Sequence, residues 1–239
     1  MKIGVGLIVK GGKEFIEKWI KGAEQITTQI FVVDNEADVE VKNILINHPK
    51  VKQYHIQKGM KRNQSRDYQK LLEMAREEDC TWMFNIDIDE IVPEVDVEYF
   101  VEHLLNTTDE SVGFPLVEMR DNDNTFMHIP WNNDGLKQAR LCHKCYKILS
   151  HFEFNQKDVH GISIPHNCKA GTAFPMPIKH YGHYTKKLRD EKKKYYSQKN
   201  FKDVTEKNAP WLDDKVKLGD FNELAKEHFP IVKIKEEKK

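Results

Sequence analysis

The chain lacks long hydrophobic runs, net charge and an export signal, and each absence excludes a class of protein. No apolar stretch reaches the length of about 20 residues that a membrane-spanning helix needs. The 38 Lys and Arg residues equal the 38 Asp and Glu residues, which argues against a dedicated nucleic-acid binder. Because no apolar core and small-residue cleavage site follow Met1, we expect no signal peptide and a cytoplasmic location.

Glycine-rich phosphate-binding motifs are also missing. Neither Gly-x4-Gly-Lys-Ser/Thr nor Gly-x-Gly-x2-Gly occurs, so nucleoside-triphosphate and dinucleotide sites lack support. The chain has only 4 cysteines, which we expect to be reduced thiols. Cys142 and Cys145 have the spacing of a zinc-ligand pair, but in a predicted strand they face opposite sides and no second pair follows. Free buried thiols are therefore the default, and structural zinc is the alternative.

The charge is unevenly distributed along the chain. Residues 186–239 hold 16 basic and 11 acidic residues, a net charge of +5, and the rest of the chain therefore carries −5. The basic end is a candidate contact for anionic lipid, glycan or a partner protein, which would make the protein peripheral at a membrane. The alternative interpretation is a solvated helix face.

Strands and helices alternate over the first 110 residues, which predicts a mostly parallel sheet covered by helices on both faces. In such sheets, ligands bind at the carboxyl ends of the strands. The expected strands are 2–9, 30–33, 51–56 and 81–88, and the expected helices are 15–23, 41–46, 63–78 and 96–105.

The pattern changes after residue 110. We expect strands at 112–119 and 141–149, a turn-rich stretch at 121–135, a broken strand pair at 152–164, a loop at 166–177 and a charged helix at 186–199. The prediction is one α/β domain over 1–185, with halves 1–110 and 111–185. A charged helical extension, 186–239, packs on it.

Three acids end the most apolar predicted strand, Trp82-Met83-Phe84-Asn85-Ile86-Asp87-Ile88-Asp89-Glu90. If the backbone stays extended, Asp87 and Asp89 point to the same side. Two such carboxylates suit Mg²⁺ or Mn²⁺, which can hold a diphosphate. The alternative is a capping or loop-polar cluster.

Two other classes of protein share part of this pattern. Haloacid-dehalogenase phosphatases also have Asp-x-Asp after a buried strand, but here Glu90 and Ile91 replace the residues that follow the motif in those enzymes. An EF-hand calcium loop needs further oxygen ligands, which are missing from this segment.

Several further motifs follow one another in a characteristic order. They are Ile8-Val9-Lys10, Val32-Val33-Asp34-Asn35, Gln64-Ser65-Arg66-Asp67-Tyr68, the strand ending in Asp87-Ile88-Asp89-Glu90, Val159-His160-Gly161 and Lys179-His180-Tyr181-Gly182-His183-Tyr184. Over roughly residues 1–190 this order resembles family 2 glycosyltransferases of the GT-A fold. The resemblance implies a GT-A-type, Rossmann-like α/β fold. It also implies a metal-dependent enzyme that moves a sugar from a nucleotide-diphosphate sugar, foremost a UDP-sugar, to a hydroxyl of a glycan, lipid-linked or protein acceptor, with inversion.

The resemblance also implies residue roles on the donor side. Asp34 would contact the base or ribose, and an acid after a β-branched strand can accept such hydrogen bonds. The remaining nucleotide-sugar contacts would come from Val9, Arg62, Arg66 and Asp87. For Arg66 a surface salt bridge is the alternative. Metal ligands would be Asp87, Asp89 and His180, with Mn²⁺ or Mg²⁺ as the cofactor.

For acceptor binding we expect Trp131, Arg140 and His160. Trp131 could stack on an acceptor sugar, with loop packing as the alternative. Direct displacement needs a carboxylate that takes the proton of the acceptor hydroxyl. We place Asp158 first for that role, because it lies two residues before His160, and Asp121 second.

Two departures from the family pattern leave the choice of donor open: Glu36-Ala37-Asp38 follows Asp34-Asn35, and the third helix carries Arg66-Asp67. Two other functions stay open as well. One is a metal-dependent nucleotidyltransferase or phosphohydrolase, and the other is a non-catalytic glycan-binding module of the same fold.

Overall fold

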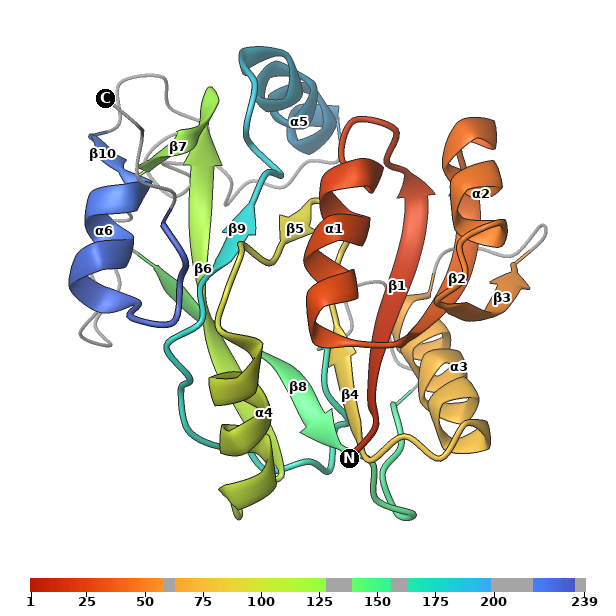
Figure 1. Ribbon diagram of the computed structural model, residues 1–239. Helices are drawn as coiled ribbons and strands as arrows, with labels where there is room; N and C mark the ends of the chain where they lie inside the picture. Colours follow the sequence, from red (N-terminus) through yellow and green to blue (C-terminus); the bar gives the residue numbers. More distant parts are fainter. Residues whose placement is uncertain (58–62, 128–138, 156–162, 199–216, 235–239) are drawn as a thin grey trace.

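A mixed sheet with helices on both faces forms the centre of the molecule (Figure 1). The computed structural model describes residues 1–57, 63–127, 139–155, 163–198 and 217–234. The strands are β1 (Ile3–Gly11), β2 (Gln29–Ala37), β3 (Val51–Ile56), β4 (Trp82–Asn85), β5 (Glu90–Ile91), β6 (Ser111–Arg120), β7 (Asn122–Met127), β8 (Arg140–Lys147), β9 (Ile178–His180) and β10 (Leu218–Asp220). The helices are α1 (Ile16–Ile26), α2 (Val39–Ile46), α3 (Gln64–Glu77), α4 (Val97–Asn106), α5 (Lys186–Gln198) and α6 (Phe221–His228).

The sheet is parallel in its first half and largely antiparallel in its second. Strand order is β10-β7-β6-β8-β4-β1-β2-β3, and β3, β2, β1 and β4 all pair in parallel. β8 joins β4 and β6 in antiparallel pairing, and β9 pairs with β5 and β6. The predicted α/β fold, with a sheet flanked by helices, is confirmed. β1 and β4 both point upward in Figure 1, and β4 ends beside Gly6, before the end of β1.

Side-chain alternation divides the core between the two sheet faces. Val5, Leu7 and Phe84 belong to one cluster, which packs under α1, α2, α4 and α6. Phe31 and Met83 belong to the other cluster, which packs under α3. Both faces are apolar because a parallel strand covered by helices buries both sets of its side chains. This double cover holds the strand ends, and the polar residues that follow them, in fixed positions.

Some expected elements differ in the structure. The strand predicted at 81–88 ends at Asn85, and the turn-rich stretch contains β7, which pairs with β6 after a tight reversal at Asp121. The strand pair expected at 152–164 is wrong for its described residues, 152–155 and 163–164, which form no strand. β9 and β10 were not predicted, because three residues are too few to show a periodicity.

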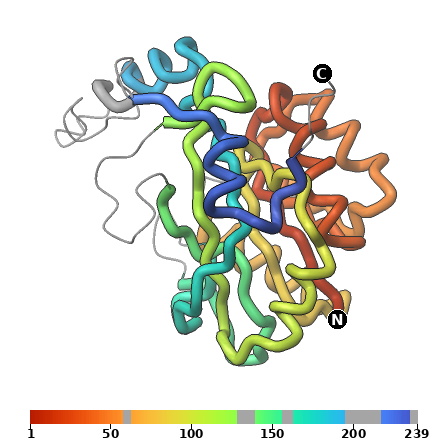
Figure 2. Tube along the Cα trace, turned by 60° about the vertical axis from the view of Figure 1, so that its left-hand side comes forward, coloured from red at the N-terminus to blue at the C-terminus, as the bar shows by residue number. Residues whose placement is uncertain are grey.

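The C-terminal part adds to the sheet rather than only covering it. β10 pairs with β7, and Val232 forms a bridge with Val95 in the segment after β5. Figure 2 shows this C-terminal segment running beside the residues that follow β5. The charged helix expected at 186–199 is present as α5. None of the described helices is both long and apolar enough to span a lipid bilayer.

Candidate active site at the carboxyl ends of the strands

A tight turn follows β4 and separates the two aspartates. The Asp87 carbonyl accepts a hydrogen bond from the Glu90 amide at 2.9 Å, and Glu90 Oε2 accepts one from the Asp87 amide at 2.9 Å. The backbone is therefore not extended here, and the expectation that Asp87 and Asp89 share a strand face is wrong. The extended geometry fails because β4 ends at Asn85, so the period-2 alternation no longer applies.

Asp87 and Glu90 meet a buried lysine that comes from β8. Lys144 Nζ lies 2.8 Å from Glu90 Oε1 and 3.5 Å from Asp87 Oδ2. The Asp87 side chain is 35% exposed, whereas those of Lys144 and Glu90 are almost fully buried. Burial alone would lower the pKa of Lys144, but the charges of Asp87 and Glu90 raise it well above the usual value. The lysine therefore stays charged and offsets part of the negative charge of the turn.

Asp89 points instead toward a histidine from β9. Asp89 Oδ2 lies 3.6 Å from His180 Nε2, and His180 Nδ1 lies 2.7 Å from Glu118 Oε2. His183 Nδ1 lies 3.4 Å from the same Glu118 oxygen. Burial would raise the pKa of Asp89, but the charge of His180 and its hydrogen bond lower that pKa to about 2.

The pair Asp89 and His180 fits a divalent cation. Two ligand atoms 3.6 Å apart can both contact a metal ion at about 2.1 Å. Glu118 holds the opposite ring nitrogen of His180, which is the arrangement that orients metal-binding histidines. Mg²⁺ and Mn²⁺ commonly use one or two carboxylates, with phosphate oxygens and water completing the shell. The donor set therefore suits the cofactor that the sequence implies.

The predicted third ligand, Asp87, is placed differently. Among the described residues, Glu118, His180 and His183 form the group whose possible ligand atoms lie within 4.8 Å of one another. Asp87 and Asp89 are both outside that group; Asp89 contacts His180, whereas Asp87 contacts Lys144, with Tyr68 Oη 3.4 Å away. The Asp87 side chain is thus held by Lys144 and remains partly exposed to solvent.

Asp34, at the end of β2, is buried and already has partners. Its Oδ1 accepts the Ala37 amide at 2.7 Å, and its Oδ2 accepts the Tyr54 hydroxyl at 2.8 Å. Val9 pairs with Asp34 in the β1–β2 register. The residue expected to contact the nucleotide thus also fixes the loop that follows β2, and a ribose hydroxyl would have to share its oxygens with Tyr54.

Arg66 lies in the first turn of α3, beside Asp67, which contacts Asn35 of β2. The Asn63 side chain caps α3 by accepting the Arg66 amide at 3.0 Å. The Arg66 guanidinium contacts the fully buried Asp67 carboxylate at 2.9 Å, and Asp67 also accepts a hydrogen bond from Asn35. The salt bridge that was the alternative for Arg66 is therefore present, with a buried partner rather than a surface one.

The other expected site residues lie apart from the turn or outside the described residues. Asp121 has a left-handed backbone (φ 60°), is 53% exposed, and its Oδ1 accepts Arg189 Nη1 at 3.1 Å. Arg140 opens β8 at the surface, opposite Leu116 of β6. Four of the expected residues lie outside the described residues: Arg62, Trp131, Asp158 and His160.

Two residues of the site were missed by the sequence analysis in these roles. Glu118 is a lone acid inside the apolar strand 112–119, and that isolation was a usable signal because carboxylates are rarely buried without a partner. Lys144 gave no comparable signal, since its neighbours in β8 are a mixture of polar and apolar residues. Only the antiparallel pairing of β8 with β4 brings it to the acidic turn.

Comparisons with known proteins give no family assignment. No protein-family model matches the chain, and no curated protein matches it. Among solved structures, S. aureus TarS is similar over 50% of this chain and 22% of that chain, with 11% identity and a TM-score of 0.39. S. aureus TarS 1–349 in complex with UDP-GlcNAc is similar over 50% of this chain and 34% of that chain, with 12% identity and a TM-score of 0.37. The chain thus matches about a third or less of those proteins, at scores too low to establish a shared fold.

Proposed function

We propose that this protein is a metal-dependent glycosyltransferase that uses a nucleotide-diphosphate sugar, foremost a UDP-sugar. The observation that carries the proposal is the contact of Asp89 with His180, whose other nitrogen is held by Glu118, at the carboxyl-end edge of the sheet. This edge is where α/β proteins bind nucleotides and phosphates. The motif order of the sequence supports the same conclusion.

The acidic and basic residues around the turn would have different roles in binding the donor. Asp89 and His180 would hold Mn²⁺ or Mg²⁺, and a bound divalent ion would stabilise the negative charge on the departing diphosphate. Lys144 offsets Glu90 and Asp87, so that the acidic turn repels the diphosphate less. Asp87 is left to contact the ribose or diphosphate.

Further residues would contact the nucleotide of the donor and the acceptor. Asp34 and Arg66 contact the nucleotide, with Val9 and Arg62 beside them. The acceptor hydroxyl belongs to a glycan, a lipid-linked sugar or a protein, and Trp131, Arg140 and His160 bind the acceptor. A carboxylate, Asp158 before Asp121, takes the proton of that hydroxyl, and displacement from the opposite face inverts the anomeric carbon.

Thermal unfolding in the presence of UDP-, GDP-, dTDP- and CDP-sugars, with and without Mn²⁺, tests this proposal. We expect one nucleotide class to raise the melting temperature, and only with the metal present, because a ligand that binds the folded state stabilises it. Asp89→Asn should abolish the rise. Asp79→Asn is the matched control, because Asp79 is an exposed turn residue (φ 54°) before β4, and asparagine tolerates that conformation.

The reaction products distinguish a glycosyltransferase from the alternative functions. A glycosyltransferase releases nucleoside diphosphate when an acceptor is added, whereas a nucleotidyltransferase releases or consumes pyrophosphate. A glycan-binding module would bind glycan equally well as wild type and as Asp89→Asn, with no turnover in either. Indifference of the melting temperature to all four donors, with and without Mn²⁺, would contradict the proposal.

A further inference from the structure

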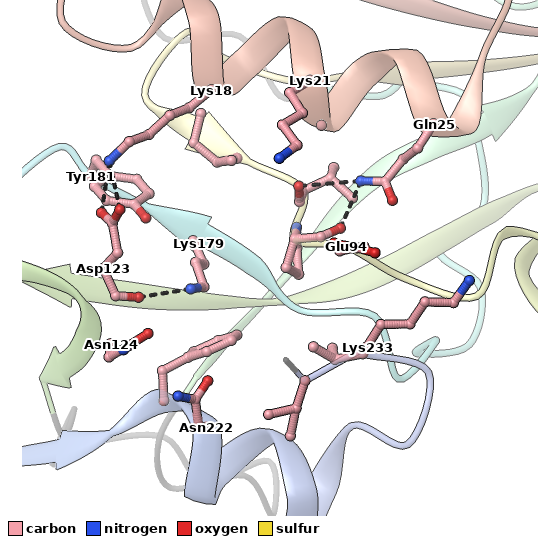
Figure 3. A pocket seen from close by; sticks show the side chains of 17 residues that line it. Lys18, Lys21, Gln25, Glu94, Asp123, Asn124, Lys179, Tyr181, Asn222 and Lys233 are labelled. Carbon is pink, nitrogen blue, oxygen red and sulfur yellow. Dashed lines mark hydrogen bonds and ion pairs between the residues drawn. The ribbon is translucent and has the colours of Figure 1, made fainter. Parts of the chain in front are cut away.

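A cavity lies on the other side of β9 from the acidic turn. It has a volume of about 520 Å³ and is enclosed by α1, the segment after β5, β9, α6 and the residues after α6 (Figure 3). Lys179 and His180 are consecutive in β9 and therefore face opposite sides of the strand. His180 faces Asp89, whereas Lys179 faces this cavity. The cavity is thus separate from the proposed donor site.

Four lysines line the cavity against two acids, Asp123 and Glu94, so that the lining carries more positive than negative charge. Lys18 is neutralised by Asp123, with Nζ 2.8 Å from the carboxylate. Lys21, Lys179 and Lys233 also line the cavity, and within the described part of the chain none of the three forms an ion pair with a carboxylate. The cavity therefore has unbalanced positive charge, which favours an anion.

Lys179 is the most informative of these lysines because it is largely shielded from solvent. Its Nζ donates to the Asp123 carbonyl at 2.7 Å and lies 3.9 Å from the centroid of the Phe221 ring. An ammonium group has three donors, and the carbonyl uses one of them. Burial lowers the pKa of Lys179 to about 8, so holding its charge here is costly without a further partner. An acidic group in the cavity would supply that partner.

The rest of the lining suits an organic body. Apolar side chains from three segments, Ile91, Phe221, Val232 and Ile234 among them, form the walls, and the Asn124 and Asn222 amides lie at one end (Figure 3). The volume is within the range of about 300–1,000 Å³ that small-molecule sites occupy. We propose that this cavity binds a small organic anion, a phosphate monoester or carboxylate, whose acidic group contacts Lys179 and whose body packs on Phe221.

Isothermal calorimetry with glucose 6-phosphate as the probe, in EDTA, tests this site without the metal-dependent one. We expect saturable binding that Lys179→Met weakens roughly tenfold or more, because a charge-assisted hydrogen bond is lost. The matched control is Lys2→Met, since Lys2 Nζ also donates to a single backbone carbonyl, that of Glu78 at 3.2 Å, far from the cavity. Lys2→Met should change the affinity less than about twofold.

Three further measurements make the outcome decisive. Asp89→Asn should leave glucose 6-phosphate binding unchanged, and glucose alone should not bind. Inorganic phosphate should bind more weakly than glucose 6-phosphate, because it lacks the body that packs on Phe221. The proposal is overturned if no probe binds, if Lys179→Met binds as wild type does, or if Asp89→Asn removes binding, which would place the anion at the donor site. Equal affinity for inorganic phosphate would contradict the organic body.

Discussion

Two single residues, Gly182 and Glu118, fix the position of the His180 side chain. A Cβ atom at Gly182 would lie 2.7 Å from His180 Nε2 and 3.0 Å from Asp89 Oδ2, so any larger residue would press against both side chains. Glu118 fixes the same ring from its other nitrogen. The residues that we propose to bind the metal and the residues that position them are therefore different, and one of the positioning residues, Glu118, belongs to no sequence motif.

Gly182→Ala should weaken Mn²⁺-dependent nucleotide-sugar binding by about tenfold, because the added methyl group displaces His180 from Asp89. Urea unfolding of the metal-free variant should show a loss of stability as well, because displacing His180 also disturbs its 2.7 Å contact with the buried Glu118 carboxylate. Calorimetric titration with the nucleotide sugar that stabilises wild type measures the first effect. Wild-type affinity in the variant would show that this contact is not needed.

Lys144→Met should destabilise the fold by about 3 kcal/mol, because it leaves Glu90 buried without its cationic partner. The double variant Glu90→Gln with Lys144→Met should recover most of that loss. Lys70→Met is the control, because its pair with Glu73 is exposed and should contribute less than about 1 kcal/mol. Urea unfolding measures all four proteins. Equal destabilisation of the single and double variants would show that the buried charge is not the cause.

At the scale of elements, local sequence predicted most helices well and the short strands poorly. α3 and α4 are found where their apolar spacing placed them. β9 has three residues, and its position depends on pairing with both β5 and β6. A motif on such a strand can be recognised in the sequence, but the partner that its side chains meet depends on pairing between distant segments.

Helix capping gives a test at this scale. The Asp96 side chain accepts the Glu98 and Tyr99 amides at the start of α4, whereas Asp38 makes no such bond at the start of α2. Asp96→Ala should therefore lower the free energy of unfolding by about 1 kcal/mol. Asp38→Ala is the control and should cost less, about 0.5 kcal/mol or below. A larger loss in the Asp38 variant, measured by urea unfolding, would contradict the assignment of the caps.

The packing of distant segments around Lys179 buries its ammonium group, which disfavours the charged form. Because its folded pKa is about 8 and its usual value is 10.5, the unfolded chain binds more protons between these pH values. The contribution of Lys179 to stability therefore rises with pH across that window, and its charge is a cost at pH 7.

Lys179→Met should consequently be more stable than wild type at pH 7, by about 2 kcal/mol. The difference should shrink as pH rises from 8 toward 10.5, because wild type then loses the proton that opposes folding. Urea unfolding at three pH values measures it, with Lys2→Met as the control for loss of a lysine that lies far from the cavity. A difference that is independent of pH would show that Lys179 is not held in the environment described here.

The sequence by itself determined the α/β class, the positions of most helices and the buried strand that the acids follow, because apolar periodicity is a local property of the chain. It also identified Asp89 and His180 as candidates for one site. Only the tertiary structure decided that Asp87 faces Lys144, that Glu118 holds His180, and that Lys179 faces a separate cavity. These depend on which strands pair and on how a turn closes, and such contacts join residues far apart in the sequence, where no local pattern records them.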